Sequence, residues 1–190
     1  MAFDKLTHWQ IYDETGRRKY VREDERARFL EAAQQLDLPM QLLCEVLAFT
    51  GCRVSEALNL HRHQLDTERL TLTIRTLKRR RTVFRVIHIP EPLAAALARL
   101  PPHSDGRFWV IHRTTAWRIV KRLMDMVHVT GPMACCKGLR HGFGIRAAGR
   151  NVPEGLIQRW MGHSSRATTA VYLDAVGCEE RAFAMRLWSQ

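Results

Sequence analysis

Residues 137–172 decide the fold and the chemistry of this chain, and they read KGLRHGFGIRAAGRNVPEGLIQRWMGHSSRATTAVY. This stretch collects several basic groups and one tyrosine, at Lys137, Arg140, His163 and Tyr172. A phosphodiester transition state carries extra negative charge on its non-bridging oxygens, which guanidinium groups match with paired, permanently charged donors. A tyrosine can attack phosphorus to form a covalent intermediate. The stretch therefore indicates chemistry on a phosphate.

The spacing of these groups adds detail. If the chain is helical from Lys137 to Ala148, Lys137 and Arg140 share one face, so that both head groups reach one phosphate. A tyrosine has an unperturbed pKa of about 10, so Tyr172 needs a base or a cationic field to ionise, and His163 and Lys137 are the candidates. Two plainer readings stay open: a structural histidine at position 163 and a core aromatic at position 172.

The order of these groups resembles the signature of a known family. Residues 137–141 (KGLRH), residues 161–165 (MGHSS) and Tyr172, nine residues after His163, are similar in type and spacing to the C-terminal motif of the tyrosine site-specific recombinases, the phage integrase family. The resemblance implies a mainly helical α+β catalytic domain with a small antiparallel β-sheet or hairpin. It also implies further site residues upstream.

Those upstream residues are present. Residues 49–58 (FTGCRVSEAL) resemble the first arginine box of the family, with Arg53 and Glu56 at the matching positions. The family also has a lysine on the turn of a β-hairpin, and Lys78 lies at the end of the expected strand Leu70–Leu77. A solvated turn or a nonspecific phosphate contact explains Lys78 as well. An arginine would not replace this lysine as a proton donor, because its proton is held too tightly.

The resemblance implies a set of roles. The catalytic residues would be Arg53, Lys78, Lys137, Arg140, His163 and Tyr172, with Glu56 and His141 in supporting positions. Tyr172 would attack the phosphate to give a 3′-phosphotyrosyl link, and Lys78 would protonate the leaving 5′ oxygen. At position 137 this chain has a lysine where the family more commonly has a histidine. The lysine keeps a hydrogen-bond donor for the phosphate but removes a base whose pKa is near neutral. We expect neither a metal nor a cofactor, because side chains supply the cations.

Composition narrows the class of partner. Thirty Lys and Arg against nineteen Asp and Glu give a formal charge of +11, which favours double-stranded DNA over the alternative of an anionic membrane surface. The basic side chains expected to contact DNA are Arg79, Arg80 and Arg81 on the hairpin turn and Arg118, Lys121 and Arg122 on one helix. Solvent exposure explains the helical set equally well. Five cysteines, without a secretory signal or an apolar run of membrane length, indicate the cytoplasm.

The remaining pattern predicts the order of elements. Helices are expected from about Arg22 to Leu36, from Pro39 to a stop at Gly51, and from a cap at Thr114 or Thr115. Residues 83–89 form the partner strand, interrupted by an arginine. Residues 108–111 (FWVI) read as a buried extended stretch.

Domain organisation follows from the same resemblance. Residues 1–20 read as an N-terminal arm and residues 21–190 as the catalytic domain, similar in size to the recombinases that invert fimbrial promoter segments. The tail, about residues 173–190, is expected to form a helix. It either folds back on its own domain or docks on a neighbouring protomer, as in a tetramer on two DNA sites with DNA-bending accessory proteins. Two other functions stay open: a catalytically weak DNA-binding regulator, and a nicking-closing enzyme of the type IB topoisomerase kind.

Overall fold

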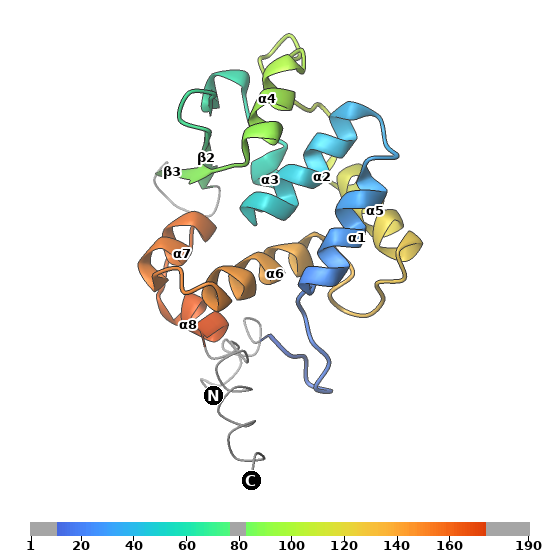
Figure 1. Ribbon diagram of the computed structural model, residues 1–190, viewed down its shortest axis with the longest axis vertical. Coiled ribbons are helices and arrows are strands. Elements are labelled where there is room, and N and C mark those ends of the chain that lie inside the picture. Colours follow the sequence, from blue (N-terminus) through green and yellow to red (C-terminus); the bar gives the residue numbers. More distant parts are fainter. Residues whose placement is uncertain (1–10, 77–82, 174–190) are drawn as a thin grey trace.

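The computed structural model describes residues 11–76 and 83–173, and it confirms the predicted α+β fold, which is mainly helical (Figure 1). The elements are, in order, α1 (Glu23–Ala33), α2 (Leu38–Thr50), α3 (Val54–Ala57), the 3-10 turn η1 (Arg62–Gln64), β1 (Leu65–Asp66), β2 (Thr71–Thr76), β3 (Val83–His88), α4 (Glu91–Arg99), α5 (Arg113–Met126), α6 (Cys136–Gly149), α7 (Glu154–Met161) and α8 (Ala167–Leu173). The expected hairpin-turn residues Lys78, Arg79, Arg80 and Arg81 and the expected tail from residue 174 lie outside the described residues.

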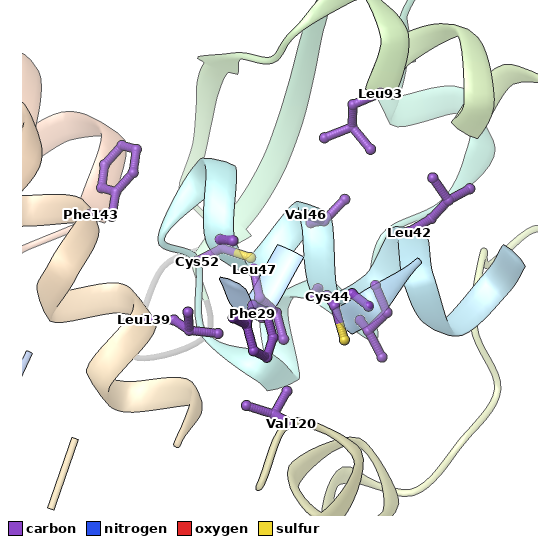
Figure 2. Close-up of a cluster of buried hydrophobic side chains, with 14 of the residues drawn as sticks. Phe29, Leu42, Cys44, Val46, Leu47, Cys52, Leu93, Val120, Leu139 and Phe143 are labelled. Atoms are coloured by element: carbon purple, nitrogen blue, oxygen red, sulfur yellow. The ribbon is translucent and has the colours of Figure 1, made fainter. Parts of the chain in front are cut away.

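Helix α2 lies at the centre of the core. Leu42, Leu43, Val46 and Leu47 are almost completely buried, and side chains from α1, α4, α5 and α6 surround them (Figure 2). The helix ends where the sequence predicts, at Gly51, which adopts a left-handed conformation with φ of 60°. A Cβ atom on Gly51 would lie 2.7 Å from the ring of Phe143, so the end of α2 packs tightly against α6.

The sheet is a three-stranded antiparallel one in the order β1-β2-β3, so β1 extends the predicted hairpin. Strands β2 and β3 pair from Thr71 with His88 to Thr76 with Val83. Arg85, which interrupts the apolar alternation of β3, points inward and is about as buried as Ile87, the next inward residue of the strand. The sheet therefore carries a charged group on its inner face.

Two sequence predictions around α5 were wrong in detail. Phe108 and Trp109 are buried and the Trp109 indole donates to the Pro39 carbonyl at 2.6 Å, but Val110 is exposed and residues 108–111 form no strand. The N-cap of α5 is His112, whose Nδ1 accepts from the Thr114 backbone N–H at 3.3 Å. An imidazole nitrogen takes the place of the hydroxyl that the sequence suggested.

Glycines allow α6 to approach its neighbours. A Cβ atom on Gly142 would lie 2.3 Å from the carbonyl oxygen of Val21, and one on Gly144 would lie 2.9 Å from the ring of Tyr172. The Val21 backbone N–H also donates to the Gly138 carbonyl at 3.1 Å. Val21, just before α1, and the ring of Tyr172 on α8 therefore both pack directly against α6.

The described part of the expected N-terminal arm makes defined contacts. Tyr12 and Arg18 form a short antiparallel bridge, and Arg18 makes an ion pair with the buried carboxylate of Glu25 in α1. Within residues 11–76 and 83–173 no helix has both the length and the apolar character needed to cross a membrane.

We expect Gly142→Ala to lower the free energy of unfolding by about 1–3 kcal/mol, because the added methyl group overlaps the Val21 carbonyl and forces α6 away from the chain. Gly155→Ala is the matched control, since a Cβ atom there meets nothing within 4 Å and alanine favours the helix by up to about 1 kcal/mol. Urea unfolding of the two variants measures both values. Equal stability of the two variants would contradict this account of α6.

Candidate active site

The expected site residues come from four separate parts of the chain. The arginine box precedes α3, the central arginine and histidine lie on α6, a second histidine follows α7, and the tyrosine lies on α8. Helices α6, α7 and α8 contact one another, and α7 also contacts β3 (Figure 1). These contacts bring Arg53, Glu56, Arg140, His141, His163 and Tyr172 into one region of the molecule.

Arg53 is the accessible guanidinium of this region. It stands at the N-cap of α3, where its backbone N–H and its Nη1 donate to the two carboxylate oxygens of Glu56, both at 2.9 Å. The Arg53 side chain is 21% exposed, whereas the Glu56 side chain is fully buried. Burial acts to raise the pKa of Glu56, but the charges and hydrogen bonds of Arg85 and Arg53 outweigh it and lower that pKa. The carboxylate is therefore a fixed anion that orients Arg53.

Arg85 is a member of the site that sequence reasoning missed. Its Nη2 donates to Glu56 at 2.6 Å, its Nη1 to the Thr76 hydroxyl at 2.9 Å and its Nε to the Trp160 carbonyl at 2.7 Å. The side chain is only 3% exposed. The available signal was a charged residue at an inward position of an alternating strand, since a buried charge requires a partner.

Arg140 connects the ends of two helices. Its Nη1 donates to the Gly51 carbonyl at 2.7 Å and its Nη2 to the Met161 carbonyl at 2.5 Å. These carbonyls lie at the C-terminal ends of α2 and α7, where the helix dipole is negative. Burial, followed by the charge of Arg53, lowers the pKa of Arg140 to about 10, so the guanidinium remains charged at neutral pH.

Tyr172 is completely buried in this conformation. Its hydroxyl lies 2.9 Å from Nδ1 of His141, and its ring stacks on the ring of His163 with centroids 5.9 Å apart and planes at 20°. Burial raises the pKa of Tyr172 to about 12, although the charges of Arg140 and Arg53 act to lower it. The phenol is therefore protonated and out of reach of a ligand in this state.

Both histidines of the site are neutral at pH 7. Burial is the main reason that the pKa of each falls to about 3, and nearby cations add to the effect. Nδ1 of His163 lies 2.9 Å from the Thr169 hydroxyl, just after the left-handed Gly162 that ends α7 as predicted. The other ring nitrogen of His141 has no hydrogen-bond partner among the residues that the structure describes.

Lys137 takes a different position from Arg140. It is exposed on the first turn of α6, and its charge contributes to lowering the pKa of His141 and of Lys19. Arg140, three residues later, points into the interior. The structure thus brings Lys137 to the edge of the region around His141, whereas Arg140 lies at its centre.

The basic face of α5 lies apart from this region. Arg118 and Arg122 are exposed, and Lys121 makes an ion pair with Asp125 at 2.7 Å. In Figure 1 α5 lies on the other side of the molecule from α7 and α8. These residues are therefore candidates only for contacts away from the site. Within the described ranges no group of three or more His, Cys, Asp or Glu side chains is placed to hold a metal ion.

Comparison with known proteins gives a consistent match. Residues 19–176 match the profile of the Phage integrase family. Tyrosine recombinase XerA of Pyrococcus furiosus is 30% identical over 166 residues, which cover 81% of this chain and 56% of that protein. The chain spans about half the length of the curated relatives it matches.

Solved structures show the same fold. One structure of the XerH site-specific recombinase, bound to a palindromic difH substrate in a post-cleavage complex, has a TM-score of 0.78 at 18% identity and covers 94% of this chain and 62% of that one. The catalytic domain of bacteriophage HP1 integrase has a TM-score of 0.67 at 20% identity and covers 87% of this chain and 93% of that domain. Because the family match includes most of the chain, from the arginine box to the tyrosine on α8, this protein belongs to the phage integrase family.

Proposed function

We propose that this chain is the catalytic domain of a site-specific DNA recombinase that cuts and rejoins strands through a 3′-phosphotyrosyl intermediate. The observation that carries the proposal is the assembly of Arg53, Arg140 and Tyr172, which are far apart in sequence, in one region of a phage integrase fold. A positively charged site next to a tyrosine is what attack on a phosphodiester requires.

The charge of the site supports this chemistry. Arg53, Arg85 and Arg140 are three cations, and among the described residues Glu56 is the one anion bonded to any of them, which leaves an excess of two positive charges in this set. A phosphodiester carries one negative charge, and a second develops as the nucleophile attacks. We propose that Arg53 binds a non-bridging oxygen and that Arg140 supplies charge from behind it, with His163 as a further donor.

Tyr172 would act after a change of conformation. Its hydroxyl is buried against His141, so attack on a DNA strand requires a movement of α8 that exposes it. We propose that Nδ1 of His141 accepts the phenol proton. A bound phosphate supports this role, because its negative charge raises the pKa of a neighbouring imidazole. His141 would then act as the base. The family more commonly has a histidine at the position of Lys137, and a lysine there does not supply a base.

Lys78 would complete the reaction. As the tyrosine oxygen bonds to phosphorus, the bond from phosphorus to the 5′ oxygen breaks, and that oxygen takes a proton from the lysine. The described residue that supports this role is Thr76, which ends β2 two residues before Lys78 and accepts a hydrogen bond from Arg85 of the site.

The proposed partner is double-stranded DNA, and one structural neighbour, the Tn1549 transposon integrase, is in complex with circular intermediate DNA. The formal charge of +11 supports a polyanionic ligand. A homo-oligomer formed through the tail, acting on two DNA sites with accessory DNA-bending proteins, remains part of the proposal.

We expect the protein to form a covalent complex with a duplex that carries a nick near the cleavage site, because loss of the short cleaved fragment prevents religation. Tyr172→Phe should abolish this complex and leave DNA binding unchanged. Tyr12→Phe is the control, because Tyr12 is exposed and lies outside the site. Mass spectrometry of the trapped peptide should find the nucleotide on Tyr172.

Other outcomes of this experiment identify other functions. Binding without any covalent complex supports a DNA-binding regulator and contradicts the proposal. A covalent complex together with relaxation of supercoils, but without joining of two sites, supports a nicking-closing enzyme.

We expect Lys78→Ala to slow cleavage of ordinary DNA by about 10²- to 10⁴-fold, as for loss of a general acid. A substrate with sulfur in place of the leaving 5′ oxygen should restore cleavage to within about tenfold of wild type, because a thiol with a pKa of about 8.5 leaves without a proton. Arg79→Ala should weaken DNA affinity without this rescue. If the sulfur substrate rescues Arg79→Ala and not Lys78→Ala, the proton donor is misassigned.

The two neutral histidines predict a pH dependence of stability. Their folded pKa of about 3 lies below the unfolded value of 6.5, so the unfolded chain binds more protons between these values. The stability that the two neutral histidines contribute should therefore be fully present above about pH 6.5. Below that pH the free energy of unfolding should decrease by up to about 1.4 kcal/mol per pH unit for each histidine. Urea unfolding between about pH 7.5 and 5 measures this slope, and His141→Gln should remove about half of it. An unchanged slope in that variant would argue against a buried neutral His141.

A further inference from the structure

We infer that Arg85 is a positioning residue for this reaction: by sharing Glu56 with Arg53 it keeps Arg53 available to a phosphate, and it fixes the end of β2 and the turn that bears His163 against that pair. The inference rests on the proposed function. It starts from three hydrogen bonds that one buried guanidinium makes to three separate parts of the chain, at Glu56, Thr76 and Trp160.

The first bond controls the charge on Glu56. One carboxylate oxygen accepts from Arg85 and from the Arg53 backbone, while the other accepts from Nη1 of Arg53. The carboxylate is thus shared by two cations, and Arg85 neutralises it from the interior. Without Arg85, Arg53 would be the only bonded cation of a fully buried carboxylate. Glu56 would then hold Arg53 more tightly, and Arg53 would bind a phosphate less well.

The second bond reaches the hairpin. Thr76 is the last residue of β2, and Arg85 lies on the paired strand β3, so the bond joins the two strands near the Thr76–Val83 end of the pair. The proposed proton donor, Lys78, follows Thr76 by two residues. The last residue of β2 is therefore bonded to the same guanidinium that neutralises Glu56.

The third bond reaches the end of α7. Nε of Arg85 donates to the Trp160 carbonyl, and a Cβ atom on Gly162 would lie 3.1 Å from Nη1 of Arg85. The neighbouring carbonyl, of Met161, accepts from Arg140. Two arginines therefore bind the last turn of α7, and His163 follows directly after it.

Arg85 cannot itself contact the substrate in this arrangement. Its side chain is only 3% exposed, and all three of its nitrogens donate to protein acceptors. An effect of Arg85 on the reaction therefore has to pass through the groups it holds. A purely structural role would change stability alone, and the test has to separate the two.

The test is a double-mutant cycle on the rate of covalent-complex formation with a saturating nicked duplex. Arg85→Met should slow this step by about 10- to 100-fold and change the half-saturating DNA concentration by less than about threefold, since the lost group acts on the bound phosphate through Arg53. In an Arg53→Ala background, the same change should slow the step by less than about threefold, because residues that act as a unit are not additive.

Arg146→Met is the matched control. Arg146 is also a largely buried arginine, with a side chain that is 16% exposed, but it pairs with Glu23 and donates to the Ala48 carbonyl outside the site. Its loss should leave the saturated rate unchanged. The inference is overturned if Arg85→Met matches the control, or if it slows the reaction by the same factor in both Arg53 backgrounds.

A second measurement needs no DNA. In nuclear magnetic resonance of the protein alone, Arg85→Met should slow the exchange of the Arg53 guanidinium protons with water by at least about threefold, because Arg53 then becomes the only bonded cation of Glu56. Adding Glu56→Gln should reverse this effect. Unchanged or faster exchange in Arg85→Met overturns the inference. Failure of the wild-type protein to form any covalent complex counts against the proposed function alone, since the exchange measurement still decides the role of Arg85.

Discussion

Three guanidinium groups share one region of this protein, and one carboxylate together with a few carbonyl groups holds them there. Two unit charges 4 Å apart repel by about 4 kcal/mol at an effective dielectric constant of about 20. Arg53 and Arg85 are both bonded to Glu56, which offsets part of that repulsion. Arg140 has no carboxylate partner among the described residues and is held by carbonyls at the ends of α2 and α7. The packing of these helices is thus what keeps the cations together.

Sequence reasoning could identify the groups that lie in fixed local patterns. Arg53 and Glu56 are three residues apart at a helix start, and Arg140 lies on a helix, so the sequence could predict their places as motifs. Arg85 was not found, because its three partners come from α3, β2 and α7 and no spacing along the chain reports them. The burial of Tyr172 was one of two alternatives that the sequence left open. The Tyr172 ring packs against α6 at Gly144, where any side chain would overlap the ring.

The burial of Tyr172 suggests an order for the proposed steps. Raising the pKa of the phenol from 10 to about 12 makes its ionisation in this conformation less favourable by about 3 kcal/mol. Exposure of the hydroxyl would remove that penalty and bring the oxygen toward the phosphate. In the proposed reaction the phenol proton would therefore pass to His141 as α8 begins to move, while the hydroxyl is still beside Nδ1. The described state would then not react with a DNA strand until a contact moves the helix.

The two arginines at the centre of the site differ in what they can do. Arg140 uses both ends of its planar guanidinium to join the Gly51 and Met161 carbonyls, a bridge that the single ammonium of lysine would not span. Its loss would leave buried acceptors unpaired, so its chemical and structural contributions are inseparable. Arg53 is partly exposed and rests on a carboxylate that Arg85 already neutralises. It can therefore exchange part of its contact with Glu56 for a phosphate oxygen while the helices stay in place.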